Sequence, residues 1–320
     1  PLMAAAGGMV APAALYLVFN AGGEGAHGWG VPMATDIAFA LGVLALLGSR
    51  APASLKVFVT AMAIGDDIGA VLVIAIFYTD KLDLNWLAIA GGLLLLLILF
   101  NVLRVRSRLM FVVVALVIWF AFFESGLHAT LAGVLVAFAI PCRVSRQPLE
   151  FVTWARDRLG EIETLHKPDA HPLERAEEDA IARALSRAAR QVQSPLHRLE
   201  HLLHPYTSFI IIPLFALANA GIPLGGSNVL DLLVSPVSLG IITGLVVGKQ
   251  LGVTLFAYAT VKLGLADLPE GLSWKHIYGA SWLGGIGFTM SLFVASLAFR
   301  HSPQMTSQAK LAILVASLIS

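Results

Sequence analysis

The sequence is short of charge and nearly free of cysteine. Only 13% of its 320 residues are Asp, Glu, Lys or Arg, and 58% are hydrophobic, whereas a soluble domain carries about 25% charged residues. Water is therefore not the main solvent of this chain, which we expect to lie in a lipid bilayer. The formal net charge of +1 leaves no basic excess for nucleic acid. Cys142 is the single cysteine, so an internal disulfide is excluded and we assign this thiol no role.

Both ends of the sequence lack features that a complete membrane chain would have. The chain opens at Pro1 on an apolar run, without a methionine or a basic leader, and this predicts a truncated start. The last apolar run, Lys310–Ser320, is shorter than the roughly 20 residues that a spanning helix needs. We therefore expect the chain to be cut at both ends.

Apolar runs between polar breaks predict ten membrane segments. They are Leu2–Asn20, Thr35–Leu47, Leu55–Tyr78, Leu84–Leu103, Leu109–Phe123, Leu127–Pro141, Tyr206–Ala220, Val237–Leu265, Ile277–Phe299 and Lys310–Ser320. A short run can be a buried helix of the soluble type. So many in series, joined by short loops, favour an all-α, polytopic membrane protein whose helices are tilted, broken or shielded by neighbours.

Basic residues predict the orientation of these segments. Loops that follow the even-numbered segments hold nearly all the lysine and arginine, which marks them as cytoplasmic. Residues 1–141 then form six segments and residues 205–320 form four, joined by a charged cytoplasmic loop at 142–204. Within that loop, Pro172 to Gln193 predicts an amphipathic helix. We expect a solvated surface helix there rather than a dedicated regulatory domain.

Among the charges that fall within the predicted segments, four stand out: Asp36, Asp66, Asp67 and Lys249. A charge near the bilayer centre costs a few kcal/mol at least. A structural ion pair would account for one acid and one base. Three acids against one lysine leave at least one carboxylate that is neutral, hydrated or bound to a mobile ion, so we favour a functional role.

The chemistry of these groups indicates which ion is bound. Carboxylate, hydroxyl and carbonyl oxygens are hard ligands for hard cations. Burial favours the protonated form of a carboxyl group, whereas a bound cation favours the ionised form. Asp66 and Asp67 are adjacent, so repulsion between them adds to the proton affinity of the pair. Competition between a proton and a sodium ion for one site is the basis of antiport, because binding of one ion releases the other.

Two of the predicted segments are interrupted. Val31 and Pro32 precede the short segment Thr35–Leu47, and segment nine contains three interior glycines: Gly284, Gly285 and Gly287. Each glycine weakens a helix by up to about 1 kcal/mol relative to alanine, although small residues can also mark close helix packing. The interrupted segment is second of three in both 1–78 and 237–320, which predicts an inverted repeat with its broken backbone at the membrane midplane.

That repeat would bring the charged groups together. Lys249 in segment eight could then compensate the carboxylates of segment three. Asp36, which follows Thr35, could lie at the positive ends of the half-helices.

The chain resembles the NhaA family of sodium/proton antiporters, which is itself one of the examples behind the inverted-repeat rule. The matching stretches are Ala34–Gly42, Gly65–Ala70, His128–Val134, Arg198–Pro205, Gly248–Lys249 and Gly285–Ser291. The resemblance runs from end to end apart from the loop at 142–204. It implies the interrupted-helix fold of that family without its first two transmembrane helices.

The resemblance also implies roles for single residues. Asp67 is then the principal ion and proton carboxylate, with Asp66 as the second carboxylate and partner of Lys249, both ligating sodium transiently. Asp36 with Thr35 is a polar group at the crossing of the broken helices. The remaining matches form a cytoplasmic cluster tied to pH activation, or alternatively a generic interfacial polar collar: Glu200, His201 and His204.

The sequence departs from the family pattern in two places. Gln250 follows Lys249 where a proline often stands, which could alter the bend of segment eight. The cytoplasmic insertion is also longer, which puts a simple transfer of regulatory behaviour in doubt. His128, at the external start of segment six, is expected to be structural.

We expect a secondary transporter of the bacterial inner membrane, not an enzyme, that exchanges cytoplasmic sodium, and lithium too, for external protons. Exchange of two protons for one sodium would make it electrogenic. No cofactor is expected, and the family implies a homodimer whose contact lies in the missing N-terminal part. Two alternatives stay open: a sodium-coupled symporter of organic anions on a related fold, and an intramembrane hydrolase with an aspartate pair. The adjacency of Asp66 and Asp67 on one helix speaks against the hydrolase.

Overall fold

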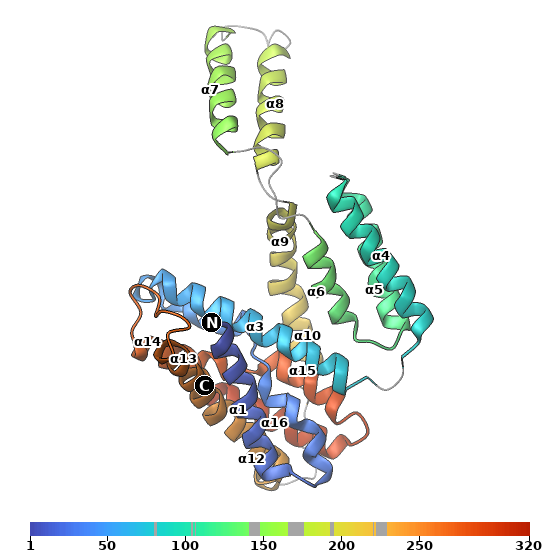
Figure 1. The fold of residues 1–320 in the computed structure, drawn as a ribbon, viewed down its shortest axis with the longest axis vertical. Helices are drawn as coiled ribbons and strands as arrows, with labels where there is room; N and C mark the ends of the chain where they lie inside the picture. Colours follow the sequence, from blue (N-terminus) through green and yellow to red (C-terminus); the bar gives the residue numbers. More distant parts are fainter. Residues whose placement is uncertain are drawn as a thin grey trace. The chain divides into compact units, whose positions relative to one another are not determined.

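The computed structural model describes residues 1–79, 82–103, 105, 107–140, 148–165, 176–192, 195–219, 221 and 229–320. Cys142 lies outside these residues. Across the described ranges the chain is helical and contains no strand (Figure 1). It divides into two compact units. The first contains Pro1–Leu84, Phe122–Leu131 and Ser208–Ser320, and the second contains Asn85–Ala121 and Ala132–Thr207.

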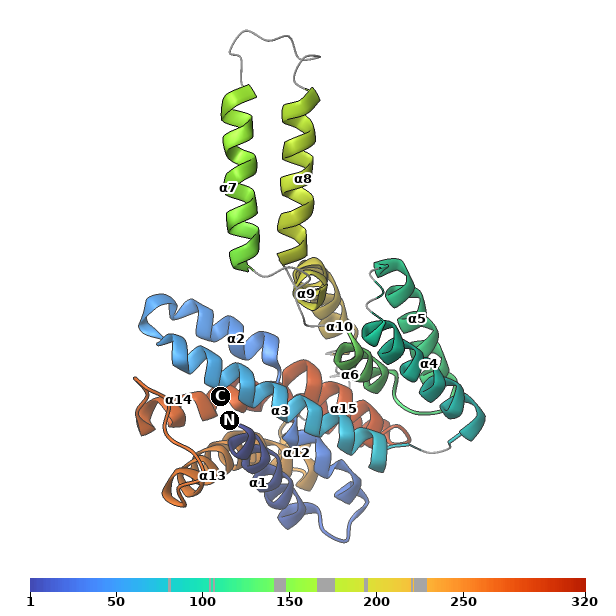
Figure 2. The ribbon, with the colours of Figure 1, turned by 45° about the horizontal axis from the view of Figure 1, so that its top comes forward.

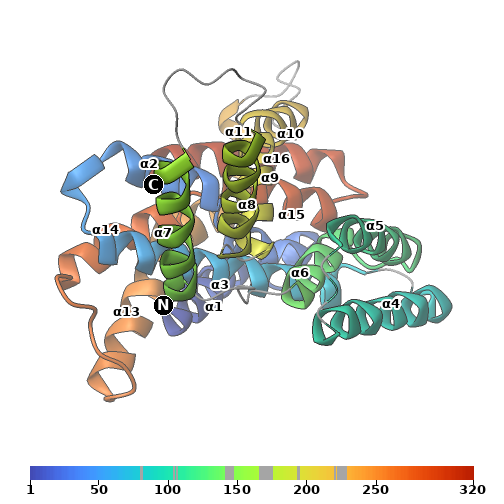
Figure 3. The same cartoon turned by 90° about the horizontal axis from the view of Figure 1, so that it is seen from above.

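The first unit is built from both ends of the chain. Its helices are α1 (Leu2–Asn20), η1 (Glu24–Met33), α2 (Ile37–Leu46), η2 (Gly48–Arg50), α3 (Ala53–Phe77), α10 (Ile212–Asn219), α11 (Val229–Leu233), α12 (Pro236–Thr243), η5 (Gly244–Gly248), α13 (Lys249–Lys262), α14 (Trp274–Gly284), α15 (Phe288–Ala298) and α16 (Pro303–Ile319). Helix α1 packs on α13, α12 and α3 (Figure 2). Helix α16 packs on α15 (Figure 3) and on α12. Segments distant in sequence therefore share one core.

Most of the predicted segments are helices of membrane-spanning length. Five described helices are long and apolar enough to cross a bilayer, and two bent pairs raise the number to seven. The other predicted segments correspond to the shorter helices α5 (Arg108–Glu124), α6 (Ala129–Ala139) and α16. The last of these begins at Pro303, earlier than the predicted Lys310, because its first turns are polar.

Both interrupted segments are broken in the structure. Helices α14 and α15 are bent by 47° across Gly285–Gly287, as predicted, while Gly284 ends α14. The other pair, η1 and α2, is bent by 40°. Here the predicted segment Thr35–Leu47 was only the second half. The span begins at Glu24 as a 3₁₀ helix, which the apolar pattern missed because its glycines and polar residues resemble a loop.

Glycines on α1, η5 and α13 bring α1 into close contact with the other two elements. A Cβ atom on Gly7 would lie 2.2 Å from the carbonyl oxygen of Gly252, and one on Gly248 would lie 2.7 Å from Cα of Pro12. Both distances are shorter than real Cβ contacts, so any side chain would force the backbones apart. Packing of this kind, rather than exclusion of water, holds helices together in a bilayer.

A wide turn precedes Lys249. Residues Gly244–Gly248 form the π-helical turn η5, in which the N–H of Lys249 donates to the carbonyl of Gly244, five residues earlier. Gln250 then continues the regular helix α13. A proline after Lys249 would distort the helix at that point. In this chain the helix is instead distorted in the turn before Lys249, by a π-bulge.

The second unit contains α4 (Leu84–Val102), α5, α6, α7 (Pro148–Leu165), α8 (Ala176–Val192) and α9 (Pro195–Tyr206). Helices α4 and α5 lie side by side (Figures 1 and 3). Edge-to-face ring contacts such as Trp86 on Phe120 join them. Helices α7 and α8 pair as a hairpin (Figure 2). Together with the turn η4 (Thr207–Ile211), α9 leads toward α10.

The predicted cytoplasmic loop contains more helix than expected. The helix predicted for Pro172–Gln193 is observed as Ala176–Val192, and its predicted ends fall outside the described residues. Helix α7 was not predicted. Helix α9 begins at Pro195, so the end of the 142–204 region is helical as well. These helices are rich in charged residues, so a search for long apolar runs does not find them.

Candidate functional site

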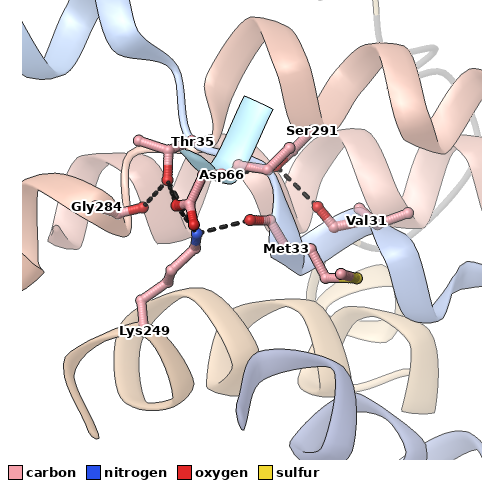
Figure 4. A network of polar contacts seen from close by, with 8 residues as sticks. Val31, Met33, Thr35, Asp66, Lys249, Gly284 and Ser291 are labelled. Atoms are coloured by element: carbon pink, nitrogen blue, oxygen red, sulfur yellow. Dashed lines mark hydrogen bonds and ion pairs between the residues drawn. The ribbon is translucent and has the colours of Figure 1, made fainter. Parts of the chain in front are cut away.

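A buried ion pair joins α3 to α13 in the first unit. Nζ of Lys249 lies 2.5 Å from Oδ2 of Asp66, and both side chains are fully buried (Figure 4). The ammonium also donates to the carbonyl of Met33 at 2.6 Å and to Oγ1 of Thr35 at 2.9 Å. An ammonium has three hydrogens, so all of its donors are used. The contact expected between Lys249 and segment three is present.

Thr35 lies in the break between η1 and α2 and contacts both sides of the crossing. Its hydroxyl is 2.7 Å from Oδ2 of Asp66 and 2.8 Å from the carbonyl oxygen of Gly284 (Figure 4). One hydroxyl carries one hydrogen, so it donates to only one of these acceptors at a time. Thr35 can therefore alternate between the ion pair and the end of α14 without moving its backbone.

Asp36 caps two helices at once. Oδ1 accepts from the N–H of Phe39 at 3.1 Å, which caps α2. Oδ2 accepts from the N–H of Thr289 at 3.1 Å and from the Thr289 hydroxyl, which caps α15. A carboxylate is favoured at a helix N-terminus by free N–H groups and by the helix dipole. The predicted position of Asp36 at the half-helix ends is confirmed.

The carbonyl ends of the broken helices are also satisfied by polar groups. The hydroxyl of Ser291 on α15 donates to the carbonyl of Val31 at 2.9 Å (Figure 4). The N–H of Asp36 donates to the carbonyl of Ile286 at 2.7 Å, joining the two breaks directly. Unwound backbone in a membrane is tolerated where protein groups replace the lost hydrogen bonds. The crossing meets this condition.

Asp67 differs from its neighbour. It is only partly buried, whereas Asp66 is fully buried. Oδ1 of Asp67 and Oδ1 of Asp66 are both buried atoms without a hydrogen-bond partner among the residues that the structure describes. Successive residues on a helix point about 100° apart. The two carboxylates offer two unpartnered oxygens from one turn of α3. Of these two carboxylates, Asp66 is the one that pairs with Lys249.

The structure brings most of the predicted site residues together in the first unit. The crossing contains Thr35, Asp36, Asp66, Lys249 and the glycine break after α14. Glu200, His201 and His204 lie on α9 in the second unit, where all three are exposed. Their role in pH activation stays a prediction.

Sequence reasoning missed the main-chain contributors. The carbonyls of Met33 and Val31 accept hydrogen bonds at the crossing, but a carbonyl carries no residue-type signal. Ser317 on α16 was also missed, although its hydroxyl accepts from the N–H of Phe288 at the start of α15. A polar residue within the apolar run Lys310–Ser320 is the signal that could have indicated it.

His128 has a local structural environment. A ring nitrogen lies 3.4 Å from the carbonyl oxygen of Tyr78, at the end of α3, and its ring packs against Phe293. These contacts agree with the structural role expected from the sequence. In the described part of the chain, no group of three or more His, Cys, Asp or Glu side chains could hold a metal ion.

The fold and site together define a class of protein. Apolar spans, two broken helices that cross, and free carboxylate oxygens at their crossing are the arrangement of a secondary ion transporter. Comparison with known proteins gives the family. The family described as "Na+/H+ antiporter 1" matches residues 1–320, and the chain belongs to it.

Individual relatives agree with this assignment. The chain is 48% identical to a protein of Syntrophobacter fumaroxidans named Na(+)/H(+) antiporter NhaA, over the whole chain and 68% of that protein. A protein of the same name from Oleidesulfovibrio alaskensis is 47% identical, with 71% of its length covered. One from Helicobacter pylori is 44% identical, with 72% covered.

Proposed function

We propose that the chain exchanges sodium ions for protons at the carboxylates of Asp66 and Asp67. As a member of its family it is a multi-pass sodium/proton antiporter of the inner membrane, not an enzyme. The names of its relatives lend no support to the alternative of an organic-anion symporter. What remains to be assigned is the part that each residue plays.

The observation that carries the proposal is the division between Asp66 and Asp67. Asp66 is sealed from solvent and held by Lys249 and Thr35, whereas Asp67 is partly exposed and not bound to the lysine. Asp67 is therefore the carboxylate that an arriving ion can reach first. Its neighbour Asp66 supplies a second hard oxygen to the same ion.

Exchange follows from competition at these oxygens. A proton or a sodium ion can neutralise Asp67, but both cannot occupy the same oxygen, so loading one releases the other. Lithium is a hard cation of the same charge and should compete in the same way. If two protons are exchanged for each sodium ion, the cycle moves net charge and responds to membrane potential. No resident cofactor is needed for these steps.

Two further features belong to the proposal. The exposed cluster on α9 (Glu200, His201 and His204) would adjust exchange to cytoplasmic pH. A homodimer would bring two such chains together, as the family resemblance implies. Neither feature is required for exchange at the carboxylates.

Transport in sealed vesicles tests the central assignment. The full chain is reconstituted into liposomes that contain a pH-sensitive dye, and a sodium pulse should move protons in the opposite direction. Asp67→Asn keeps the size of the side chain but removes its charge, so sodium-driven proton movement should fall to the level of empty vesicles. Asp267→Asn, in the exposed loop after α13, is the matched control and should behave like the unmodified protein. Retained exchange in Asp67→Asn would contradict the assignment.

A further inference from the structure

The free oxygen of Asp66 faces helix α1. A Cβ atom added to Gly8 would lie 3.5 Å from Oδ1 of Asp66 and 3.6 Å from Cδ of Lys249. Gly8 is itself buried. The main chain of α1 at Gly8 therefore covers the side of the ion pair on which Asp66 has no hydrogen-bond partner among the described residues.

The two carboxylate oxygens of Asp66 accept different numbers of hydrogen bonds. Oδ2 takes donors from both Lys249 and Thr35, while Oδ1 takes none in the described structure. A buried carboxylate oxygen without a ligand is costly, because it has lost its hydration without replacement. That oxygen is suited to a ligand that comes and goes, and any side chain at position 8 would compete with the ligand for space.

We infer that Gly8 determines ion selectivity, because the missing side chain at this position leaves space beside the buried Oδ1 of Asp66 for the transported cation. The inference rests on the proposed function and adds to it a contact and a residue. Asp66 then serves two partners at once, with Oδ2 held by Lys249 and Oδ1 on the ion. Gly8 acts through Asp66 and is a positioning residue.

Substitution by alanine should discriminate between ions of different size. A methyl group at 3.5 Å is in ordinary van der Waals contact with Oδ1, so it covers the oxygen without displacing the carboxylate. The larger sodium ion should lose more than lithium. We expect Gly8→Ala to raise the apparent KM for sodium about tenfold, equivalent to about 1.4 kcal/mol, and the KM for lithium by a smaller factor.

Serine provides a chemical contrast at nearly the same volume. The hydroxyl of Gly8→Ser can reach Oδ1 of Asp66 and donate a lasting hydrogen bond, which occupies the oxygen that the ion needs. We therefore expect Gly8→Ser to raise the KM for sodium and for lithium alike, and by more than alanine does. A residue that mattered only for packing would give the same result with alanine and serine.

Two controls separate ion contact from strain. The nearest neighbour of the added methyl is Cγ2 of Val253 at 3.0 Å, so the double variant Gly8→Ala/Val253→Ala relieves the crowding but keeps the methyl beside Asp66. Its sodium KM should remain raised. Gly65→Ala places a methyl 2.9 Å from Cβ of Ala5 at the α1 and α3 contact. This methyl is not directed at a carboxylate oxygen, so the ratio of the sodium and lithium KM values should be unchanged.

The measurements are initial rates of sodium- and lithium-driven proton movement in vesicles, with thermal unfolding of each purified variant alongside. The inference is overturned if Gly8→Ala leaves the KM ratio unchanged, or if the double variant restores the sodium KM. Failure of the proposed function would look different. In that case the unmodified protein would show no sodium-driven proton movement, or Asp67→Asn would retain it.

Discussion

The two ends of the chain form helices in the same order, but their buried side chains carry charges of opposite sign. At the N-terminal end a span (α1) precedes a broken pair (η1 and α2) and a second span (α3). At the C-terminal end α12 to α13, the pair α14 and α15, and α16 repeat that order. Among the residues that the structure describes, the three buried or partly buried acids belong to the first set and the buried lysine belongs to the second. The two sets therefore repeat the same backbone arrangement, whereas the buried acids and the buried lysine are divided between them.

This division means that neither set is electrostatically complete alone. Asp36 of the first set caps α15 of the second, and Ser291 of the second set binds a carbonyl of η1. Lys249 neutralises Asp66 across the same boundary. The crossing is thus held by groups that each set contributes to the other, and any change in their relative position must exchange those bonds.

The largest expected effect comes from breaking the ion pair. Lys249→Met keeps an unbranched side chain of similar size but leaves Asp66 buried without its cation, which should cost about 3–5 kcal/mol of unfolding free energy. The double variant Asp66→Asn/Lys249→Met removes both charges and should recover part of that loss. Denaturant or thermal unfolding in detergent measures both. Equal stability of the two variants would show that the pair does not link the two sets.

A smaller effect is expected at Asp36. Asp36→Ala removes the caps of α2 and α15 together, and at about 0.5–2 kcal/mol per cap it should cost about 1–4 kcal/mol. Ser235→Ala removes the single side-chain cap of α12 and should cost about half as much. If both variants lose the same stability in the same unfolding measurement, Asp36 caps only one helix in solution.

The smallest effect is expected at the exposed cluster on α9. Glu200 lies one helical turn from His204. Removing its charge in Glu200→Gln should move the pH profile of exchange toward lower pH, because fewer negative charges attract protons there. Unfolding should change by less than about 0.5 kcal/mol, as expected at an exposed position. An unchanged profile in vesicles, at low and high salt, would favour the generic interfacial collar.

The sequence was informative where side chains carry the signal. The four charges within apolar runs identified the ion pair, and glycines marked the break between α14 and α15. The beginning of the first broken span at Glu24 was missed, since a 3₁₀ helix rich in glycine has no apolar period of 3.6 residues. Contacts through the carbonyls of Val31 and Met33 could not be predicted, because every residue carries the same carbonyl group.

The wide turn Gly244–Gly248 sets the rotational phase of all that follows it on the same helix. A turn closed five residues back accommodates one residue more than a regular turn, and one residue corresponds to about 100° of rotation. If that residue were deleted, Lys249 would no longer be aligned with Asp66, although every other side chain were kept. The pairing of Lys249 with Asp66 therefore depends on the rotational position of Lys249 about its helix axis, and the number of residues in a single turn sets that position.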